Sequence, residues 1–192
     1  MSFYKDSESR QVDGANAQTY FWPVPFTTMR EVVSNDFSGT TSIGADGSAG
    51  LAITSLLQKN STPALEFSNG DTDSAVRLSW AASNSDAVAF QMPLPPYLDP
   101  SEDLSVKLYG SMAGTTDSLV VAADTFFDVG DTKVSDNSGT VSGTANAEYT
   151  ITIASADIPI GAHSVSVELT PGAHTTDAFY MYSCWVEGTN IP

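Results

Sequence analysis

The segment Ser164-Val165-Ser166-Val167-Glu168-Leu169 places apolar side chains at every second position and polar side chains between them. The segment Leu104-Ser105-Val106-Lys107-Leu108 repeats this alternation. Because successive side chains of a β-strand point to opposite faces, a period of two sets one group against a core and the other in water. Both segments therefore predict half-buried β-strands, and they indicate an all-β fold class.

Further strands follow from the same pattern elsewhere in the chain. Alternation recurs at residues 76–80 and 150–153. Residues 179–186 are aromatic-rich and apolar on both parities, which is typical of a central strand covered on both faces. Only residues 155–157 favour a short helical turn. Additional strand candidates are 27–34, 51–57, 64–68, 87–92 and 118–127.

Turn-forming clusters such as Asp46-Gly47-Ser48 and Pro171-Gly172 separate these segments. Eight to ten short strands joined in this way predict a two-sheet antiparallel β-sandwich. A jelly roll is the favoured version, because it is a common eight-stranded solution to the problem of exposed sheet edges. An immunoglobulin-like topology is the alternative, although the Cys…Trp…Cys spacing of antibody domains is missing.

The first 36 residues differ from the rest, and we divide the chain into a segment 1–36 and a sandwich domain 37–192. Pro23 and Pro25 follow an aromatic cluster and hold the chain extended. This segment is either a first edge strand packed into the core or an extended N-terminal arm that lays its aromatic side chains on a neighbouring subunit. The arm residues that we expect to bind a protein partner are Phe3, Tyr4, Arg10, Tyr20, Phe21, Trp22 and Arg30.

The charge of the chain excludes two classes of partner. Seven Lys and Arg residues stand against 23 Asp and Glu residues, which gives a net charge of −16 over 192 residues. Binding to nucleic acid or to anionic lipid needs clustered basic side chains, so we expect neither nucleic acid nor a membrane as partner. No apolar segment follows a basic start, so we expect no secretory signal peptide and synthesis in a host cytoplasm.

Residues capable of catalysis are few, and we expect no enzyme activity. Cys184 lies in the apolar segment 179–186, where a small buried side chain is typical. Nucleophilic catalysis needs a base, but His163 and His174 both lie beside turn residues. Three glutamates in predicted strands occupy outward polar positions rather than facing each other across a cleft. These are Glu66, Glu148 and Glu168.

Metal and cofactor sites are equally poorly represented. Residues 69–73 (Asn-Gly-Asp-Thr-Asp) and the set Asp124, Asp128 and Asp131 offer oxygen ligands for calcium. Neither matches the twelve-residue calcium loop with its closing glutamate, and turns select the same residue types on steric grounds. We therefore expect no metal and no cofactor.

Tyr97 is the best candidate for an exposed ligand-binding or partner-binding aromatic side chain. It lies in residues 93–100, a segment with four prolines that presents it at low entropic cost. Trp80 and Trp185 lie in strands with core-like neighbours, and we assign both to packing.

One weak internal similarity relates Thr115-Thr116-Asp117 to Thr175-Thr176-Asp177. In each copy the three residues precede an apolar strand. Thr and Asp side chains bond nearby backbone groups, so we expect two analogous turns rather than a repeat architecture.

Five segments carry a resemblance to a known group of proteins: Arg77-Leu78-Ser79-Trp80, Met92-Pro93, Leu104-Ser105-Val106-Lys107-Leu108, Thr116-Asp117-Ser118-Leu119 and Ser164-Val165-Ser166-Val167-Glu168-Leu169. Over about residues 65–190 the chain resembles the jelly-roll decoration (cement) proteins of tailed-bacteriophage capsids. The likeness is one of style, since the chain is acidic, rich in Thr, Ser, Gly and Asp, and nearly free of cysteine.

The resemblance implies a virion structural protein on the capsid exterior. Such a protein binds the major capsid protein and itself, usually as a homotrimer, and stabilises the joints between capsomers. Its negative charge would suit an outer surface and repel packaged DNA. The alternative function, from another class, is a receptor-binding or glycan-binding β-sandwich module of a phage head or tail fibre, with Tyr97 in its contact loop.

Overall fold

A computed structural model describes residues 18–33, 50–51, 63–68, 75–128 and 131–190. Strands dominate these residues, and the two helical segments are single 3-10 turns, η1 (Phe26–Thr28) and η2 (Ser155–Asp157). The expected helical turn at 155–157 is therefore confirmed. No helix of the described residues is long and apolar enough to cross a membrane.

Eight strands form a jelly roll, as the sequence predicts. The first strand pairs with the last, the second with the seventh, the third with the sixth and the fourth with the fifth, as in one long hairpin rolled onto itself. In chain order the strands are β5 (Val76–Trp80), β6 (Val88–Pro93), β7 (Leu104–Met112), β9 (Val121–Phe127), β10 (Val134–Asn137), β12 (Ala147–Ile153), β13 (Ser164–Pro171) and β14 (Phe179–Asn190).

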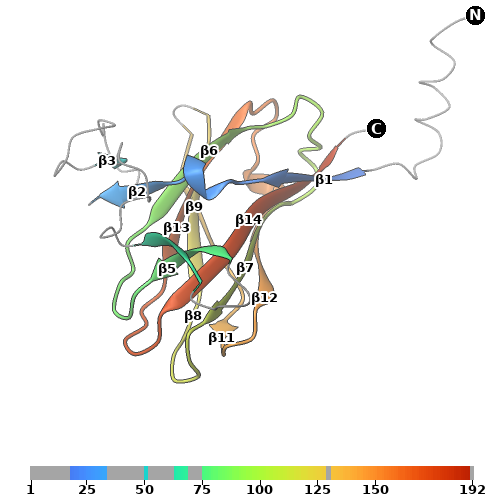
Figure 1. Cartoon of the computed structure of the whole chain (residues 1–192). Helices are drawn as coiled ribbons and strands as arrows, with labels where there is room; N and C mark the ends of the chain where they lie inside the picture. Colours follow the sequence, from blue (N-terminus) through green and yellow to red (C-terminus); the bar gives the residue numbers. More distant parts are fainter. Residues whose placement is uncertain (1–17, 34–49, 52–62, 69–74, 129–130, 191–192) are drawn as a thin grey trace, which may run out of the picture.

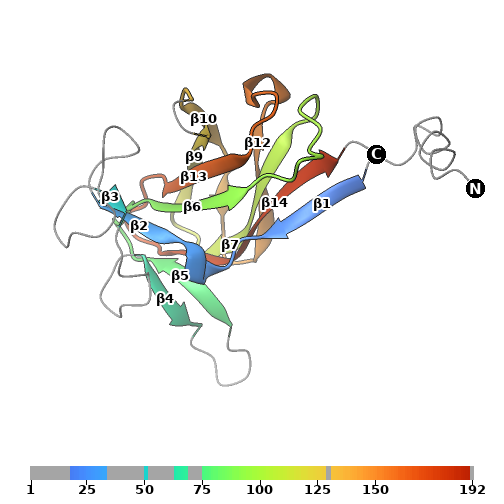
Figure 2. The same cartoon turned by 90° about the horizontal axis from the view of Figure 1, so that it is seen from above.

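Rolling divides the strands between two antiparallel sheets (Figures 1 and 2). Sheet A has the order β12-β7-β14-β5-β4, with β1 (Gln18–Pro23) also pairing with β14, and β4 spanning Ala64–Phe67. Sheet B has the order β10-β9-β13-β6-β2-β3, with β2 spanning Arg30–Val33 and β3 spanning Gly50–Leu51. The short strands β8 (Ser118–Leu119) and β11 (Val141–Ser142) pair beside them.

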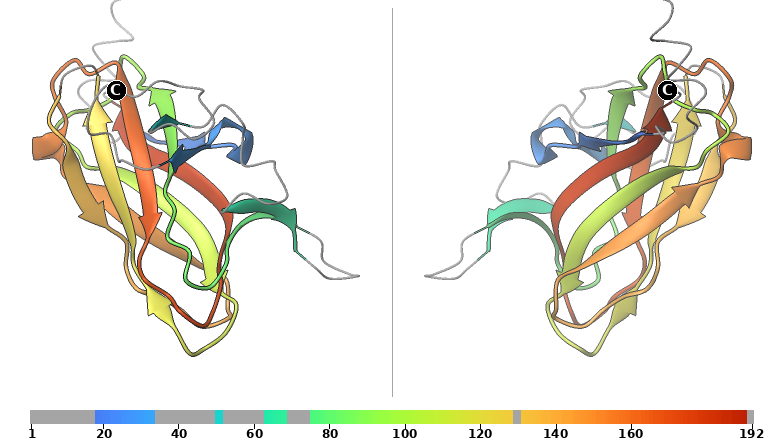
Figure 3. Two further views of the ribbon diagram at one scale, coloured as in Figure 1. Left: turned by 90° about the vertical axis from the view of Figure 1, so that its left-hand side faces the viewer. Right: turned by 90° about the vertical axis from the view of Figure 1, so that its right-hand side faces the viewer.

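The core lies between the sheets and is built from the apolar parity of each strand. Strand β7 alternates buried and half-buried residues from Leu104 to Leu108, and β9 does so along its whole length. Trp80 of β5 is 1% exposed and stacks on Phe179 of β14, with ring centroids 5.2 Å apart. Figure 3 shows the long strands β7, β12 and β14 side by side in one layer.

The described part of the N-terminal segment is built into both sheets. Strand β1 pairs with the second half of β14, and β2 pairs with β6 in the other sheet. Val24, 7% exposed, lies at the crossing and donates its backbone N–H to the Cys184 carbonyl at 2.9 Å. These residues therefore form strands, as the first of the two sequence alternatives has it, whereas Phe3, Tyr4 and Arg10 lie outside the described residues.

Two details differ from the sequence predictions. Glu168 was expected to point into water, but it is only 4% exposed, because β13 lies inside sheet B between β6 and β9. Strand β14 was expected to be buried on both faces, but only one parity is buried while the aromatic side chains of the other stay half-exposed. Of the expected strand 51–57, residues 52–57 lie outside the described residues.

Candidate functional site

The outer face of sheet A gathers aromatic and charged side chains on neighbouring strands. A register shift between Met181 and Ser183 of β14 marks a β-bulge. Tyr182 is the inserted residue of this bulge, and the insertion changes the parity that points outward, so Tyr180 before it and Trp185 after it both lie on the outer side. We call this surface the aromatic face, made of Phe21, Glu66, Arg77, Lys107, Tyr109, Glu148, Tyr180, Tyr182, Trp185 and Glu187.

One end of the aromatic face is an aromatic pair between β1 and β14. Phe21 is 59% exposed, and its ring centroid lies 5.6 Å from that of Trp185. The Trp185 indole donates its Nε1–H to Glu187 Oε1 at 2.8 Å, which fixes the orientation of the ring. The pair therefore presents a partly exposed apolar surface whose orientation is fixed.

A cation–π contact forms the other end. The Arg77 guanidinium carbon lies 3.5 Å from the centre of the Tyr180 ring, and the group donates to Glu66 at 2.9 Å and to the Tyr182 hydroxyl at 3.4 Å. Burial by itself would lower the pKa of Arg77, but the hydrogen bonds with Tyr182 and Glu66 and the nearby charges raise it overall. Arg77 is thus a cation held in place by Glu66, Tyr180 and Tyr182.

Lys107 lies between these ends, on β7. Its ammonium group is 2.9 Å from Glu148 Oε1 and 3.7 Å from Glu187 Oε2. Strand pairing sets this arrangement, because Lys107 lies opposite Trp185 on β14 and opposite Thr150 on β12. Tyr109, two residues further along β7 and 39% exposed, lies on the same side.

A small hollow of about 220 Å³ adjoins the aromatic face where the strand paired with β14 changes from β5 to β1. Its lining includes Pro23, Pro25, Phe26, Tyr182 and Cys184. Cys184 is 3% exposed, as predicted for a packing residue, and burial raises the pKa of its thiol. A thiol held in this state is a poor nucleophile, so the hollow offers shape and apolar surface rather than reactivity.

Tyr97 lies on a loop at one end of the sandwich and is 67% exposed, as expected. Near it, residues 94–96, 98, 100 and 158–163 line a second hollow of about 430 Å³. Its walls are mainly proline, leucine and isoleucine, and the structure does not bring Tyr97 to the aromatic face.

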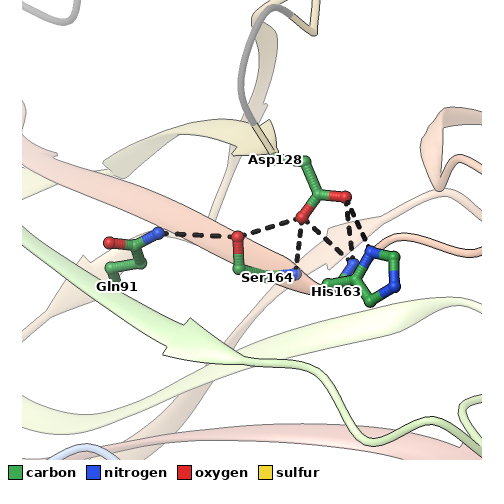
Figure 4. A network of polar contacts seen from close by, with 4 residues as sticks. All are labelled: Gln91, Asp128, His163 and Ser164. Atoms are coloured by element: carbon green, nitrogen blue, oxygen red, sulfur yellow. Dashed lines mark hydrogen bonds and ion pairs between the residues drawn. The ribbon is translucent and has the colours of Figure 1, made fainter.

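A polar network closes the same end of the molecule (Figure 4). Asp128, in a left-handed backbone conformation with φ 58°, accepts hydrogen bonds from the backbone N–H groups of His163 and Ser164. These N–H donors, His163 first, and the Ser164 hydroxyl hold the pKa of Asp128 below its usual value. Asp128 therefore fixes the loop that ends at His163 and Ser164. Its carboxylate oxygens already accept hydrogen bonds there, although a calcium ion would need them as ligands. In the described ranges, no three His, Cys, Asp or Glu side chains gather closely enough to hold a metal.

The arm residues that the structure describes have different surroundings. Phe21 belongs to the aromatic face, whereas Tyr20 stacks on Trp22 with ring centroids 6.1 Å apart. Trp22 packs against the hydrophobic core, and Arg30 donates to the carbonyls of Thr27 and Met29. That these residues bind a protein partner stays a prediction.

Sequence reasoning missed most of the aromatic face. Trp185 was assigned to packing, and Tyr180 and Tyr182 were not singled out. A usable signal was present, because Lys107 and Tyr109 share one parity of β7, and Trp185 and Glu187 share one parity of the second half of β14. The bulge in β14 hid this signal by shifting the parity halfway along the strand.

No protein-family profile and no curated protein matches the chain. Among solved structures, similar ones include a CBM36 domain of a multidomain xylanase from the hindgut metagenome of Trinervitermes trinervoides, with 16% identity, a TM-score of 0.40, and coverage of 89% of this chain and 97% of that one. Another is the xylan-binding module CBM15, with 11% identity, a TM-score of 0.49, and coverage of 91% and 100%.

A third similar structure contains the CBM22-1 and GH10 modules of Clostridium thermocellum xylanase 10B, with 11% identity and a TM-score of 0.47. It covers 93% of this chain and 29% of that one. The carbohydrate-binding modules among these structures are β-sandwiches of the jelly-roll type. The predicted fold class is confirmed, whereas kinship with phage decoration proteins stays a prediction.

Proposed function

We propose that this protein is a non-catalytic carbohydrate-binding module that holds glycans on the aromatic face. The observation that carries the proposal is the partly exposed aromatic set formed by Phe21, Trp185 and Tyr109 beside charged hydrogen-bonding groups on neighbouring strands. Sugar rings present both apolar C–H surfaces and hydroxyl groups. A site for them combines aromatic surface with a small number of placed polar groups.

The polar groups of the aromatic face suit hydroxyl recognition. Carboxylates of Glu148 and Glu187 accept hydrogen bonds from hydroxyl groups, and the Lys107 ammonium donates to hydroxyl oxygens. These side chains already contact one another within 2.9 to 3.7 Å, so little side-chain entropy is lost on binding. The scaffold beneath is the β7–β14 pair in the interior of sheet A.

The same contacts argue for binding without hydrolysis. Cleavage of a glycosidic bond uses two carboxyl groups, one of which delivers a proton to the leaving oxygen. Glu148 and Glu187 both form ion pairs with the one ammonium group of Lys107. This arrangement supports carboxylates that accept hydrogen bonds rather than a carboxylic acid that donates a proton.

Affinity electrophoresis in gels that contain soluble polysaccharides tests the proposal. We expect Trp185→Ala and Tyr109→Ala each to weaken retention by about two- to tenfold, since one aromatic contact contributes about 0.5–1.5 kcal/mol. Tyr97→Ala is the matched control, because it removes an exposed aromatic side chain at a different place.

Two results would contradict the proposal. Failure of the wild-type protein to bind any member of a glycan array would show that it is not a carbohydrate-binding module. Loss of binding in Tyr97→Ala alone, with Trp185→Ala unchanged, would move the site from the aromatic face to the loop at 93–100.

Capsid decoration is the second candidate function. It is favoured by exposed Tyr20 and Phe21 on β1, which belong to the expected N-terminal arm, and by the net charge of −16. In this function the protein would sit on the virion exterior, bind the major capsid protein and associate with itself as a homotrimer. Copy number per particle tests it, because hundreds of copies indicate shell reinforcement and none excludes it.

A further inference from the structure

We propose that the aromatic face selects uncharged glycans and rejects glycans that carry carboxylate or sulfate groups, because its carboxylates already engage both of its cations. This inference deepens the proposed function and rests on it. Recognition of an acidic glycan needs a cation free to pair with the ligand, ideally through a bidentate contact.

The described residues contain four basic side chains, and all four are engaged. Arg30 donates to backbone carbonyls, and Lys133 pairs with Asp124 at 2.9 Å. On the aromatic face, Arg77 contacts Glu66 at 2.8 Å and Lys107 contacts Glu148 at 2.9 Å. An acidic ligand would have to displace a carboxylate that the protein itself supplies.

Exposure of the charged groups reinforces this selection. The cationic side chains are 13% exposed for Arg77 and 16% for Lys107, whereas those of Glu66, Glu148 and Glu187 are 39%, 51% and 31% exposed. A ligand therefore meets three outward carboxylates before it meets either cation. Like charges repel an acidic polymer, while neutral hydroxyl groups donate hydrogen bonds to the same oxygens.

Affinity electrophoresis of the full-length protein at low salt tests this selection. The neutral probes are xylan, hydroxyethylcellulose and galactan, and the acidic probes are polygalacturonate and dextran sulfate. We expect the wild-type protein to be retained by at least one neutral polymer and by neither acidic polymer.

A gain of binding gives the sharper test. In Glu148→Gln/Glu187→Gln the Lys107 ammonium loses both ion-pair partners, and the charge of the face changes by two. We expect retention by polygalacturonate to rise about fivefold or more at low salt and the gain to disappear at high salt. Asp124→Asn/Asp131→Asn is the matched control, because it changes the net charge equally and removes the Asp124 carboxylate that pairs with Lys133, in sheet B and away from the aromatic face.

The outcomes separate the two proposals. Retention of the wild-type protein by polygalacturonate or dextran sulfate overturns the selection but leaves glycan binding intact. A folded double variant with no gain, or an equal gain in the control, also overturns it, and a thermal unfolding scan verifies folding. Retention by no polymer of either kind overturns the proposed function and this inference together.

Discussion

At the residue scale, two aspartates hold two loops together by exchanging contacts. Asp117 Oδ2 accepts hydrogen bonds from the backbone N–H groups of Thr175 at 2.8 Å and of Asp177 at 3.0 Å. Asp177 Oδ2 accepts in turn from Thr116 at 2.7 Å and from Asp117 at 2.9 Å. The internal similarity predicted two separate turns, but each carboxylate bonds the backbone of the other copy, so the pair acts as one clamp.

The clamp should make stability depend on pH. The N–H groups of Asp177, then of Thr176, lower the pKa of Asp117 in the folded protein, so its contribution is complete above the unfolded value of about 3.9 and is lost as pH falls through the folded value. We expect Asp117→Asn to have a lower Tm at pH 7 and a smaller further loss between pH 4 and pH 2. Circular dichroism melts at each pH measure the Tm, and Glu102→Gln, at an exposed position, is the control. If the Tm of Asp117→Asn and of the wild type fell in parallel between pH 4 and pH 2, the clamp would not be the cause.

The burial or exposure of a single side chain could be predicted where its neighbours in the sequence alone decide it. The small apolar context of Cys184 indicated burial, and the prolines around Tyr97 indicated exposure; both are confirmed. Glu168 and Trp185 were wrongly placed, because burial of a strand's outward parity depends on which strands flank it. That pairing joins residues far apart in the chain, and no local pattern reports it.

At the element scale, β14 decides both the fold and the candidate site. It pairs with β7 along most of its length, and on its other side with β5 and then β1. Its apolar character predicted a central strand, which the structure confirms. The bulge could not be predicted, because it appears only as a register shift against a partner strand.

The N-terminal strand gives a prediction about truncation. Deletion of residues 1–17 removes no described strand, whereas deletion of residues 1–25 removes β1, buried Val24 and Trp22, which packs near Gly188. We expect the shorter deletion to keep the wild-type unfolding free energy and the longer one to lose about 3 kcal/mol or more of it. Urea unfolding of both proteins measures this, and equal midpoints would show that β1 does not stabilise sheet A.

At the scale of the whole molecule, the jelly roll joins the two ends of the strand sequence. β5 pairs with β14, about 100 residues later, and β6 pairs with β13, more than 70 residues later. The sandwich and its favoured version could be predicted from strand number and turns, but the strand order could not. Pairing strands that are far apart in the chain costs loop-closure entropy, which only the completed packing between them offsets. We therefore expect the sandwich to fold and unfold as one cooperative unit.

Trp80 lies where this cooperativity can be tested. Its ring stacks on Phe179, and its Nε1–H donates to the Asp86 carbonyl at 2.8 Å, so truncation removes packing and a hydrogen bond together. We expect Trp80→Ala to lower the unfolding free energy by about 3–5 kcal/mol, whereas exposed Tyr97→Ala changes it little. Because both sheets share the core beneath Trp80, circular dichroism and the fluorescence of the remaining tryptophans, one of which is Trp185 on the opposite face, should report a single transition. An unchanged unfolding midpoint in Trp80→Ala would contradict the core role of Trp80. Two separated transitions would show that the two sheets unfold independently, so that the aromatic face can persist without the rest of the jelly roll.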